Sequence, residues 1–311
     1  MDVSILIISF NTRTLTLDSL ASVISQTRGV SFEVIVVDNA SSDGSADAIA
    51  ELYPQVKLVR LQENIGFARA NNRAAKQATG DFVLLLNPDT VVLDGAIQKA
   101  IAFVRTQFDD VVVGARTFFA DGSLNANSCH GQPTPWSLLC QASGLTSIFR
   151  NSAVFAPESL GSWRRDTTRE VDAVSGAFLL ISRKLWKSLG GFDESFFMYG
   201  EDTDLCLRAW KSGARCVVRP EVMLIHYGAA SDCVRPDKMI RLFRAKVQLL
   251  LKHWRPSSVR FGVGMLKAAA FSRMLASGVV QLLRPARREQ YLTWREIWRR
   301  RLEFDAVGMT P

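Results

Sequence analysis

Residues 3–38, VSILIISFNTRTLTLDSLASVISQTRGVSFEVIVVD, decide the fold of this chain. Residues 3–10 and 32–38 are short, continuous runs rich in valine, isoleucine and leucine, which is typical of strands covered on both faces. The segment between them, near residues 14–27, is long enough for one helix. The stretch therefore predicts a strand, a helix and a second strand parallel to the first.

The same alternation continues to about residue 107. We expect further strands over residues 56–61 and 81–89, and helices near residues 43–53, 67–78 and 94–107. Strict alternation of strands and helices predicts an α/β fold with a doubly wound, mostly parallel sheet. In such sheets, ligands bind beyond the carboxyl ends of the strands.

Polar residues follow four of the predicted strands, in the runs Ser9-Phe10-Asn11, Asp38-Asn39, Asn64-Ile65-Gly66 and Asn87-Pro88-Asp89. Asp38 is suited to accept a hydrogen bond from the imide N–H of a pyrimidine, and Phe10 offers a ring to lie against the base. Asp89 offers a hard oxygen to Mg²⁺ or Mn²⁺. Each run alone also fits ordinary turn chemistry, so the prediction of a nucleotide crevice rests on their coincidence at one sheet edge.

Two common nucleotide motifs are missing from the sequence. The first strand is followed by SFNTRT (residues 9–14), without the G-x-G-x-x-G turn of dinucleotide-binding oxidoreductases, and no G-x-x-x-x-G-K-[ST] loop occurs. The sequence therefore argues against a dinucleotide oxidoreductase and against a P-loop enzyme.

Residues 190–208, GGFDESFFMYGEDTDLCLR, concentrate acidic and aromatic residues ahead of a predicted helix that runs to about residue 212. Glu201 and Asp202 open this helix, where acids are favoured by the helix dipole alone. Asp204 lies four residues before Arg208, the spacing of a helical ion pair. The segment therefore predicts either capping acids or carboxylates used in acid–base chemistry.

Six segments in order resemble the motifs of family 2 glycosyltransferases with the GT-A fold. They are SFN (9–11), VVDNASSDGS (36–45), NIGFARANN (64–72), LLLNPDT (84–90), VSGAFLLI (174–181) and GGFDESFFMYGEDTDLCLR (190–208). Within that family the chain is most similar to the bacterial rhamnosyltransferases of cell-surface polysaccharide assembly. The resemblance covers residues 3–230.

The resemblance implies roles for residues of the first strands. Asp38 would bind the base with Phe10 behind it, and Asn11 and Asn39 would complete this part of the nucleotide-sugar site.

Other implied contacts concern the donor diphosphate. Arg69 and Asn72 would lie near the sugar diphosphate, and Asp89 would bind the metal ion. Asn87 stands where the family has the first acid of its D-x-D motif, so its role would be a contact to ribose or to metal-bound water. His226 matches a histidine that completes the metal site in some members, although a structural histidine is the alternative.

Asp202 matches the general base of the family, beside Glu201, while His130 and His253 match nothing. The implied reaction is an inverting, metal-dependent transfer of L-rhamnose from dTDP-rhamnose to a saccharide on a polyprenyl diphosphate. The alternatives are a UDP-hexose or UDP-galactofuranose transferase, and a non-catalytic carbohydrate-binding or scaffold protein.

The net charge of +8 is unevenly distributed along the chain. Residues 1–234 hold 21 Lys and Arg against 25 Asp and Glu, whereas residues 235–304 hold 17 against 4. Such a basic tail favours nucleic acid or an anionic membrane as a partner. The sequence lacks helix-turn-helix, zinc and aromatic-basic RNA motifs, so a membrane is favoured.

The tail alternates apolar and basic residues. Residues 259–283 are apolar but are interrupted by three basic residues, which leaves no charge-free run beyond about ten residues, shorter than a membrane span needs. Residues 284–301 add Trp294, Trp298 and seven arginines. We expect helices lying in the membrane interface, with a helical hairpin packed on the body as the alternative.

We accordingly expect a GT-A catalytic domain over residues 1–234, with a nucleotide-sugar half (1–120) and an acceptor half (121–234), followed by a membrane-associating extension (235–311). The N-terminus lacks the basic n-region of a signal peptide, so a cytoplasmic protein on the inner face of the plasma membrane is expected. The cysteines are expected to be reduced and buried: residues 129, 140, 206, 216 and 233.

Overall fold

The computed structural model describes residues 1–228 and 236–305, which form two compact units. The first unit comprises residues 1–130, 164–197 and 201–230, and the second comprises residues 131–163, 198–200 and 231–311. Residues 131–163 thus group with the C-terminal helices. The domain boundary expected at residue 234 stays a prediction.

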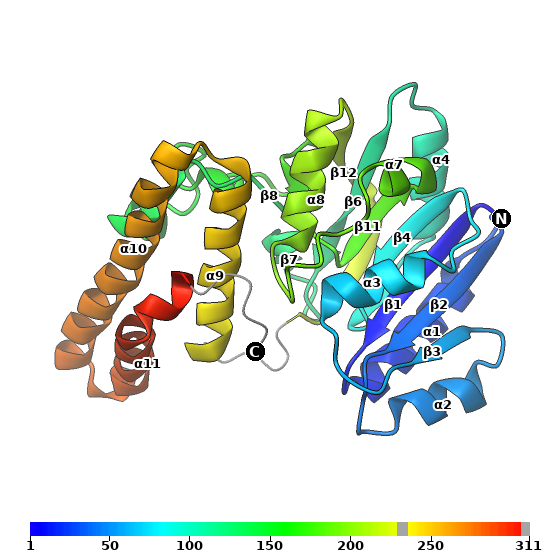
Figure 1. Ribbon diagram of the computed structural model, residues 1–311, viewed down its shortest axis with the longest axis horizontal. Helices are drawn as coiled ribbons and strands as arrows, with labels where there is room; N and C mark the ends of the chain where they lie inside the picture. The colour runs from blue at the N-terminus through cyan, green and yellow to red at the C-terminus, as the bar shows by residue number, and fades with distance from the viewer. Residues whose placement is uncertain (229–235, 306–311) are drawn as a thin grey trace. The chain divides into compact units, whose positions relative to one another are not determined.

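The first unit is built on a mixed sheet with strand order β3-β2-β1-β4-β11-β6-β12-β5, with β7 beside β6 and β9 beside β12 (Figure 1). The strands of this unit are β1 Val3–Ser9, β2 Phe32–Asp38, β3 Lys57–Arg60, β4 Phe82–Leu86, β5 Thr90–Val92, β6 Val111–Phe118, β7 Leu124–Asn125, β8 Cys129–His130, β9 Arg169–Glu170, β10 Ala173–Val174, β11 Phe178–Ser182 and β12 Arg215–His226. Strands β8 and β10 form a separate two-stranded sheet.

Parallel pairing aligns the carboxyl ends of the first strands, because β1 pairs in parallel with both β2 and β4. Strand β11 enters between β4 and β6 and is antiparallel to both, whereas β12 is parallel to β6. The mostly parallel α/β sheet predicted from the sequence is therefore confirmed, with β11 as an antiparallel strand that periodicity did not predict.

Helices of this unit connect the strands, as the alternating sequence predicts. They are α1 Arg13–Gln26, α2 Ser45–Leu52, α3 Phe67–Ala75, α4 Ala96–Arg105, α7 Arg183–Ser188 and α8 Glu201–Lys211. The strand predicted over residues 81–89 is shorter, since β4 ends at Leu86 and the chain then leaves its line to form β5 at the other side of β12. Residues 87–89 are therefore a connecting segment.

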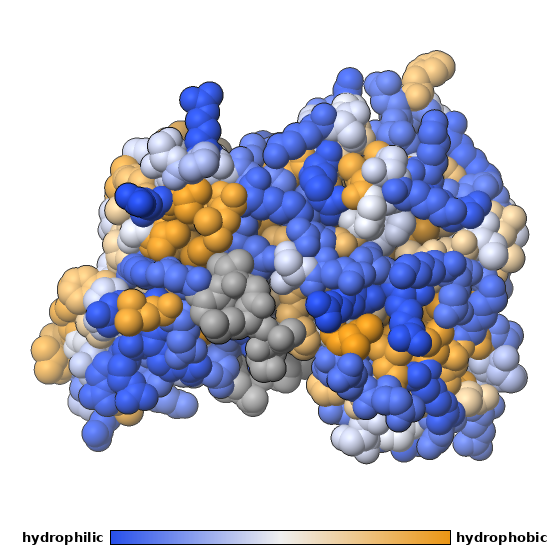
Figure 2. All heavy atoms as spheres, viewed as in Figure 1, coloured by the Kyte–Doolittle hydropathy of each residue, from blue (hydrophilic) through white to orange (hydrophobic). Residues whose placement is uncertain are grey.

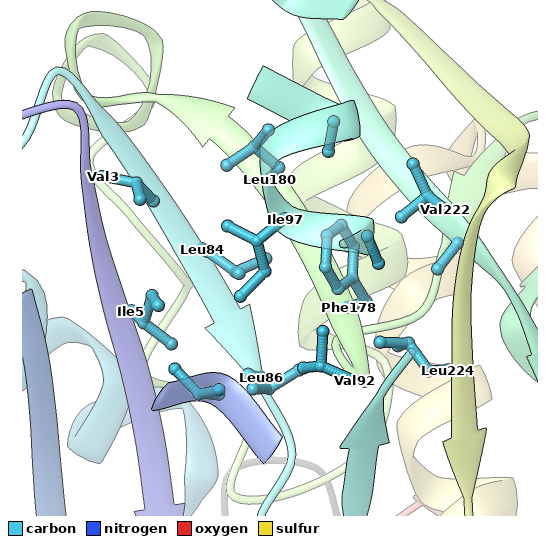
Figure 3. Close-up of a cluster of buried hydrophobic side chains, with 14 of the residues drawn as sticks. Val3, Ile5, Leu84, Leu86, Val92, Ile97, Phe178, Leu180, Val222 and Leu224 are labelled. Carbon is cyan, nitrogen blue, oxygen red and sulfur yellow. The ribbon is translucent and has the colours of Figure 1, made fainter. Parts of the chain in front are cut away.

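Figure 3 shows the core of the first unit, in which Val3, Ile5, Leu84 and Leu86 meet side chains of other elements. Ile97 comes from α4, and Phe178 and Leu180 come from β11; all of these side chains are buried. Burial of apolar area at roughly 25 cal/mol per Å² is the main term that stabilises such a sheet. The same burial fixes the register of the strands and therefore the position at which each strand ends.

The second unit is helical. Its elements are α5 Pro135–Ala142, α6 Leu145–Ile148, η2 Pro157–Ser159, α9 Pro236–His253, α10 Pro256–Leu283, η3 Pro285–Arg287, α11 Arg288–Arg299 and η4 Arg301–Asp305. Leu138 of α5 packs in one cluster with Leu250, Leu266 and Ile297 of the C-terminal helices. The rings of Phe243 and Phe304 stack in the same cluster, with centroids 4.5 Å apart.

Helix α10 is longer than the apolar run recognised in the sequence. By length and composition alone, its 28 residues suffice to cross a membrane. The basic residues Lys267 and Arg273 interrupt its apolar sequence. The expectation that this segment is too short to span a bilayer is therefore corrected. A count of charge-free runs alone misses that the helix as a whole is long and apolar enough to cross a membrane.

Four of the cysteines, at positions 129, 140, 206 and 216, are buried free thiols, as predicted. The fifth, Cys233, lies outside the described residues.

Gly66 lies against the backbone of Phe197, and a substitution at this position tests their close approach. Its φ of +84° suits glycine, and a Cβ at this position would lie 2.6 Å from the carbonyl oxygen of Phe197. We expect Gly66→Ala to lower the free energy of unfolding by about 2–4 kcal/mol, measured by urea denaturation.

The matched control is Gly29→Ala, at a φ of +68° with nothing within 4 Å of the new Cβ. This variant should lose only about 1 kcal/mol, the penalty of the backbone conformation alone. Equal losses in the two variants would contradict the close approach of Phe197 to Gly66.

Candidate active site

Asp38 ends β2 directly opposite Ser9, the last residue of β1. Its side chain is buried, and Oδ2 accepts a hydrogen bond from the backbone N–H of Ser41 at 3.1 Å. Oδ1 is buried and has no hydrogen-bond partner among the described residues. A buried acceptor without a donor destabilises the folded protein, and a ligand that donates a hydrogen bond to it removes this cost. Asp38 is therefore suited to bind an N–H group.

The residues around Asp38 hold the two strand-end turns together. Phe10 is 43% exposed, which leaves its ring accessible to a ligand. Asn11 is used internally, since its Oδ1 accepts from the backbone N–H of Ser42 at 2.8 Å. Asn39 is also used internally, because its amide donates to Asn64 Oδ1 at 2.8 Å. The predicted donor contacts of Asn11 and Asn39 stay predictions.

The segment at residues 87–89 is fixed at both ends by backbone hydrogen bonds. The N–H of Asn87 donates to the carbonyl of Ala177 at 3.2 Å, and the N–H of Tyr227 donates to the carbonyl of Asp89 at 2.9 Å. Thr90 then pairs with His226 at the start of β5. This pairing brings the carboxylate that follows β4 to the carboxyl end of β12.

Asp89 Oδ1 and His226 Nε2 lie 3.2 Å apart, and both side chains are only partly buried. The Nδ1 atom of His226 lies 3.5 Å from the side-chain amide nitrogen of Asn125. An octahedral ion with bonds of about 2.1–2.2 Å has neighbouring ligand atoms about 3.0–3.1 Å apart. One oxygen and one imidazole nitrogen at this spacing fit two adjacent positions around Mn²⁺ or Mg²⁺.

Within residues 1–228 and 236–305, no group of three His, Cys, Asp or Glu side chains is arranged to hold a metal ion. Asp89 and His226 are the pair of side chains that would hold such an ion. Mg²⁺ commonly binds in this way, through one or two protein ligands together with substrate phosphates.

Asp202 lies in the first turn of α8, and backbone groups fix its carboxylate. Oδ2 accepts from the N–H of Gly176 at 3.1 Å, and Oδ1 accepts from the N–H of Thr203 at 2.7 Å. A Cβ on Gly176 would lie 3.4 Å from the ring of Phe67 and 3.9 Å from the Cβ of Asp202. The carboxylate therefore lies against a bare backbone next to an aromatic ring.

Glu201 is buried beside Asp202, and its Oε2 has no hydrogen-bond partner among the described residues. Burial, and secondarily the charge of Asp202, raise the pKa of Glu201 from an ordinary 4.5 to about 8. Glu201 thus holds its proton at neutral pH. Asp204 forms the predicted ion pair with Arg208 at 2.8 Å.

Helix α3 carries the other two predicted donor contacts. The side chain of Asn72 donates to the carbonyl of Phe192 at 2.9 Å and accepts from its N–H at 2.9 Å. Asn72 therefore braces the segment before α8, and its predicted donor contact stays a prediction. Arg69 is half exposed and lies 3.9 Å from Glu194, which leaves its guanidinium accessible to an anion.

Two neighbours of the predicted residues carry no recognised signal in the sequence. His130 Nε2 lies 3.1 Å from Thr203 Oγ1, although the sequence assigned no role to this histidine. Asn125 meets His226 from the short strand β7. Both lie in a stretch without periodicity, where no pattern indicates which residues face the site.

Two family models match the sequence. The model described as glycosyl transferase family 2 matches residues 4–160, and the one described as glycosyl transferase family group 2 matches residues 134–266.

Two relatives illustrate the similarity to characterised proteins. The O-antigen biosynthesis protein RfbC of Myxococcus xanthus is 30% identical over 215 residues, which cover 68% of this chain but only 16% of that protein. The N-acetylglucosaminyl-diphospho-decaprenol L-rhamnosyltransferase of Mycobacterium tuberculosis is 28% identical over 224 residues, covering 64% of this chain and 67% of that enzyme.

Solved structures support the fold. A mannosyltransferase from Pyrobaculum calidifontis in complex with GDP-Man and Mn²⁺ aligns with a TM-score of 0.59 at 19% identity, covering 98% of this chain and 86% of that one. Residues 1–349 of S. aureus TarS align with a TM-score of 0.53 at 16% identity, covering 99% and 92%. At these identities, the likeness concerns the fold.

The buried Glu201 predicts a dependence of stability on pH. Because its pKa is raised in the folded state, its stabilising contribution is complete below pH 4.5 and is lost as the pH rises toward 8. Glu201→Gln removes this titration. The unfolding free energy of the variant, relative to the parent, should therefore increase between pH 5 and 8, by at most about 1.4 kcal/mol per pH unit.

Urea denaturation at several pH values measures this difference. Glu51→Gln, at an exposed position of α2, is the control and should show a constant difference from the parent. A constant difference for Glu201→Gln as well would show that Glu201 is ionised in the folded protein.

Proposed function

Because the chain belongs to glycosyl transferase family 2, we propose that it transfers a sugar from a nucleoside-diphosphate donor to an acceptor hydroxyl. The observation that carries this proposal is the pair Asp89–His226, whose ligating atoms lie 3.2 Å apart where the strands end. This pair suits a divalent ion bridging to a diphosphate. The relatives named above support the same reaction class.

The donor we propose is dTDP-L-rhamnose. The open acceptor Oδ1 of Asp38 fits the imide N–H of thymine, and the exposed ring of Phe10 fits a base stacked against it. Uracil presents the same imide, so Asp38 does not separate this donor from UDP-hexose or UDP-galactofuranose. The preference for rhamnose rests on the rhamnosyltransferase among the relatives.

The mechanism we propose is a single displacement with inversion. Asp202 would accept the proton of the acceptor hydroxyl as the new glycosidic bond forms, a contribution of roughly 100- to 10,000-fold. Glu201 is protonated beside it and so adds no second negative charge near the incoming hydroxyl. Asp89 and His226 would hold a divalent ion, which neutralises charge on the departing diphosphate.

The acceptor we propose is a saccharide on a polyprenyl diphosphate, met at the cytoplasmic face of a membrane. Most of the exposed large hydrophobic side chains lie in the second unit, including Leu282 at 81% and Leu283 at 78%. Figure 2 shows hydrophobic residues at the outer edge of this unit, at the end of α10, next to the hydrophilic surface of α11. Such neighbouring surfaces suit acyl chains and anionic headgroups.

Two substitutions separate the roles of the proposed site. Asp202→Asn should lower kcat by at least 100-fold and leave donor affinity unchanged, because the amide cannot accept the proton. Asp89→Ala should weaken metal-dependent donor binding at least tenfold. Turnover with dTDP-rhamnose and isothermal calorimetry, each with Mg²⁺ and with a chelator, measure the two effects.

Near-normal turnover of Asp202→Asn would refute the assignment of the base. Binding of UDP-sugars in preference to dTDP-rhamnose would redirect the donor assignment while keeping the reaction class.

The second unit should bind anionic vesicles through the end of α10. Because two exposed leucines leave water on binding, Leu282→Glu/Leu283→Glu should weaken sedimentation with phosphatidylglycerol vesicles at least tenfold. Leu52→Glu, a matched change at an exposed leucine of α2, should leave binding unchanged. Deleting the tail is a poorer test, since α10 and α11 supply the core of their own unit.

Release of bound protein by high salt is the expected result for interfacial attachment. Retention through alkaline carbonate extraction would instead indicate that α10 spans the bilayer, and equal binding of all variants would contradict the proposed surface.

A further inference from the structure

A chain of hydrogen bonds leads away from Asp202 to a histidine. Thr203 Oγ1 lies 3.3 Å from Asp202 Oδ1 and 3.1 Å from His130 Nε2. The backbone N–H of Thr203 also donates to Oδ1, at 2.7 Å. One residue therefore holds this oxygen with two donors and connects it to an imidazole.

The direction of the chain follows from the donors available. A threonine hydroxyl has one proton, and a carboxylate is a stronger acceptor than a neutral imidazole nitrogen. Thr203 therefore donates to Asp202, which leaves the lone pairs of Oγ1 to accept. His130 must then carry its proton on Nε2 and donate it to Thr203.

The β8–β10 sheet places both ends of this arrangement. His130 pairs with Ala173, and the N–H of Ser175 donates to the carbonyl of Ser128 at 2.9 Å. The next residue along the same segment, Gly176, donates its N–H to Asp202 Oδ2. One small sheet thus reaches both oxygens of the carboxylate, directly at Oδ2 and through His130 at Oδ1.

We propose that His130 is a positioning residue that acts through Thr203 to hold the Asp202 carboxylate in the orientation needed to accept the acceptor proton. His130 does not contact the substrate in this scheme, and the proton of Thr203 stays on Thr203. The occupied Oδ1 leaves Oδ2, which has a single backbone donor, as the oxygen that receives the proton. The inference rests on the proposed role of Asp202 as base.

A double-mutant cycle tests the chain. His130→Ala and Thr203→Val should each lower kcat about tenfold at saturating donor and acceptor, with KM for the donor unchanged. Because both changes break the same chain, the double variant should also lose only about tenfold. A loss of about 100-fold, the product of the two single losses, would overturn the proposal.

Conservative variants provide the controls. Thr203→Ser keeps the hydroxyl, and His130→Gln places an amide N–H near the position of Nε2, so both should retain kcat within about threefold of the parent. His130→Asn is too short to reach Thr203 and should behave like the alanine variant. Equal kcat for the Gln and Asn variants would contradict the chain, even if His130→Ala does not fold.

Two further readouts separate this inference from the proposed function. If His130 only positions Asp202, the Gln and Asn variants should have the same thermal unfolding temperature and the same calorimetric donor affinity. If His130 were merely structural, its loss in the Asn variant would change both quantities. If Asp202→Asn abolishes transfer while the His130 variants turn over normally, the base assignment stands and the role of His130 is refuted. If Asp202→Asn turns over normally, the assignment of Asp202 as the base is wrong, and the role of His130 is refuted with it.

Discussion

The parallel pairing of β1 with β2 and β4 is the constraint on which the site depends. Ser9 and Asp38 end their strands as register partners, and Leu86 ends β4 beside Ile7 of β1. These strands are buried on both faces, so a shift in register would move whole rows of apolar side chains out of the core. The hydrophobic core therefore fixes, within a residue, where each polar strand end lies.

Strands β11 and β12, the first antiparallel to β4 and the second parallel to β6, then extend this edge beyond the first four strands. Strand β11 brings Ala177 against the N–H of Asn87, and β12 brings His226 against Asp89. The two acids of the proposed chemistry, Asp89 and Asp202, are consequently positioned by different structural elements. Asp89 depends on backbone pairing across the sheet, whereas Asp202 depends on the first turn of a helix and on the N–H of Gly176.

The sequence predicted what periodicity controls. The strands of the first half, Asp38 at the end of β2 and the helix that begins at Glu201 could all be inferred, because each follows from a run of apolar residues or from helix-start chemistry. Asp89 was expected at the end of a strand but lies in the connecting segment after β4. The antiparallel β11 and the pairing of His130 with Ala173 could not be inferred, since partners 43 positions apart leave no local pattern. The burial that keeps Glu201 protonated is equally a property of tertiary packing.

The second unit draws its core from two distant parts of the chain, because Leu138 of α5 packs with Leu266 and Ile297. During synthesis, residues 131–163 leave the ribosome about a hundred positions before the helices that cover them. The apolar side chains of residues 131–163 stay uncovered until those helices have been synthesised. The chain made in between includes strands of the first unit. The helical unit is therefore expected to be the last part to fold, and its maturation depends on an intact C-terminal end.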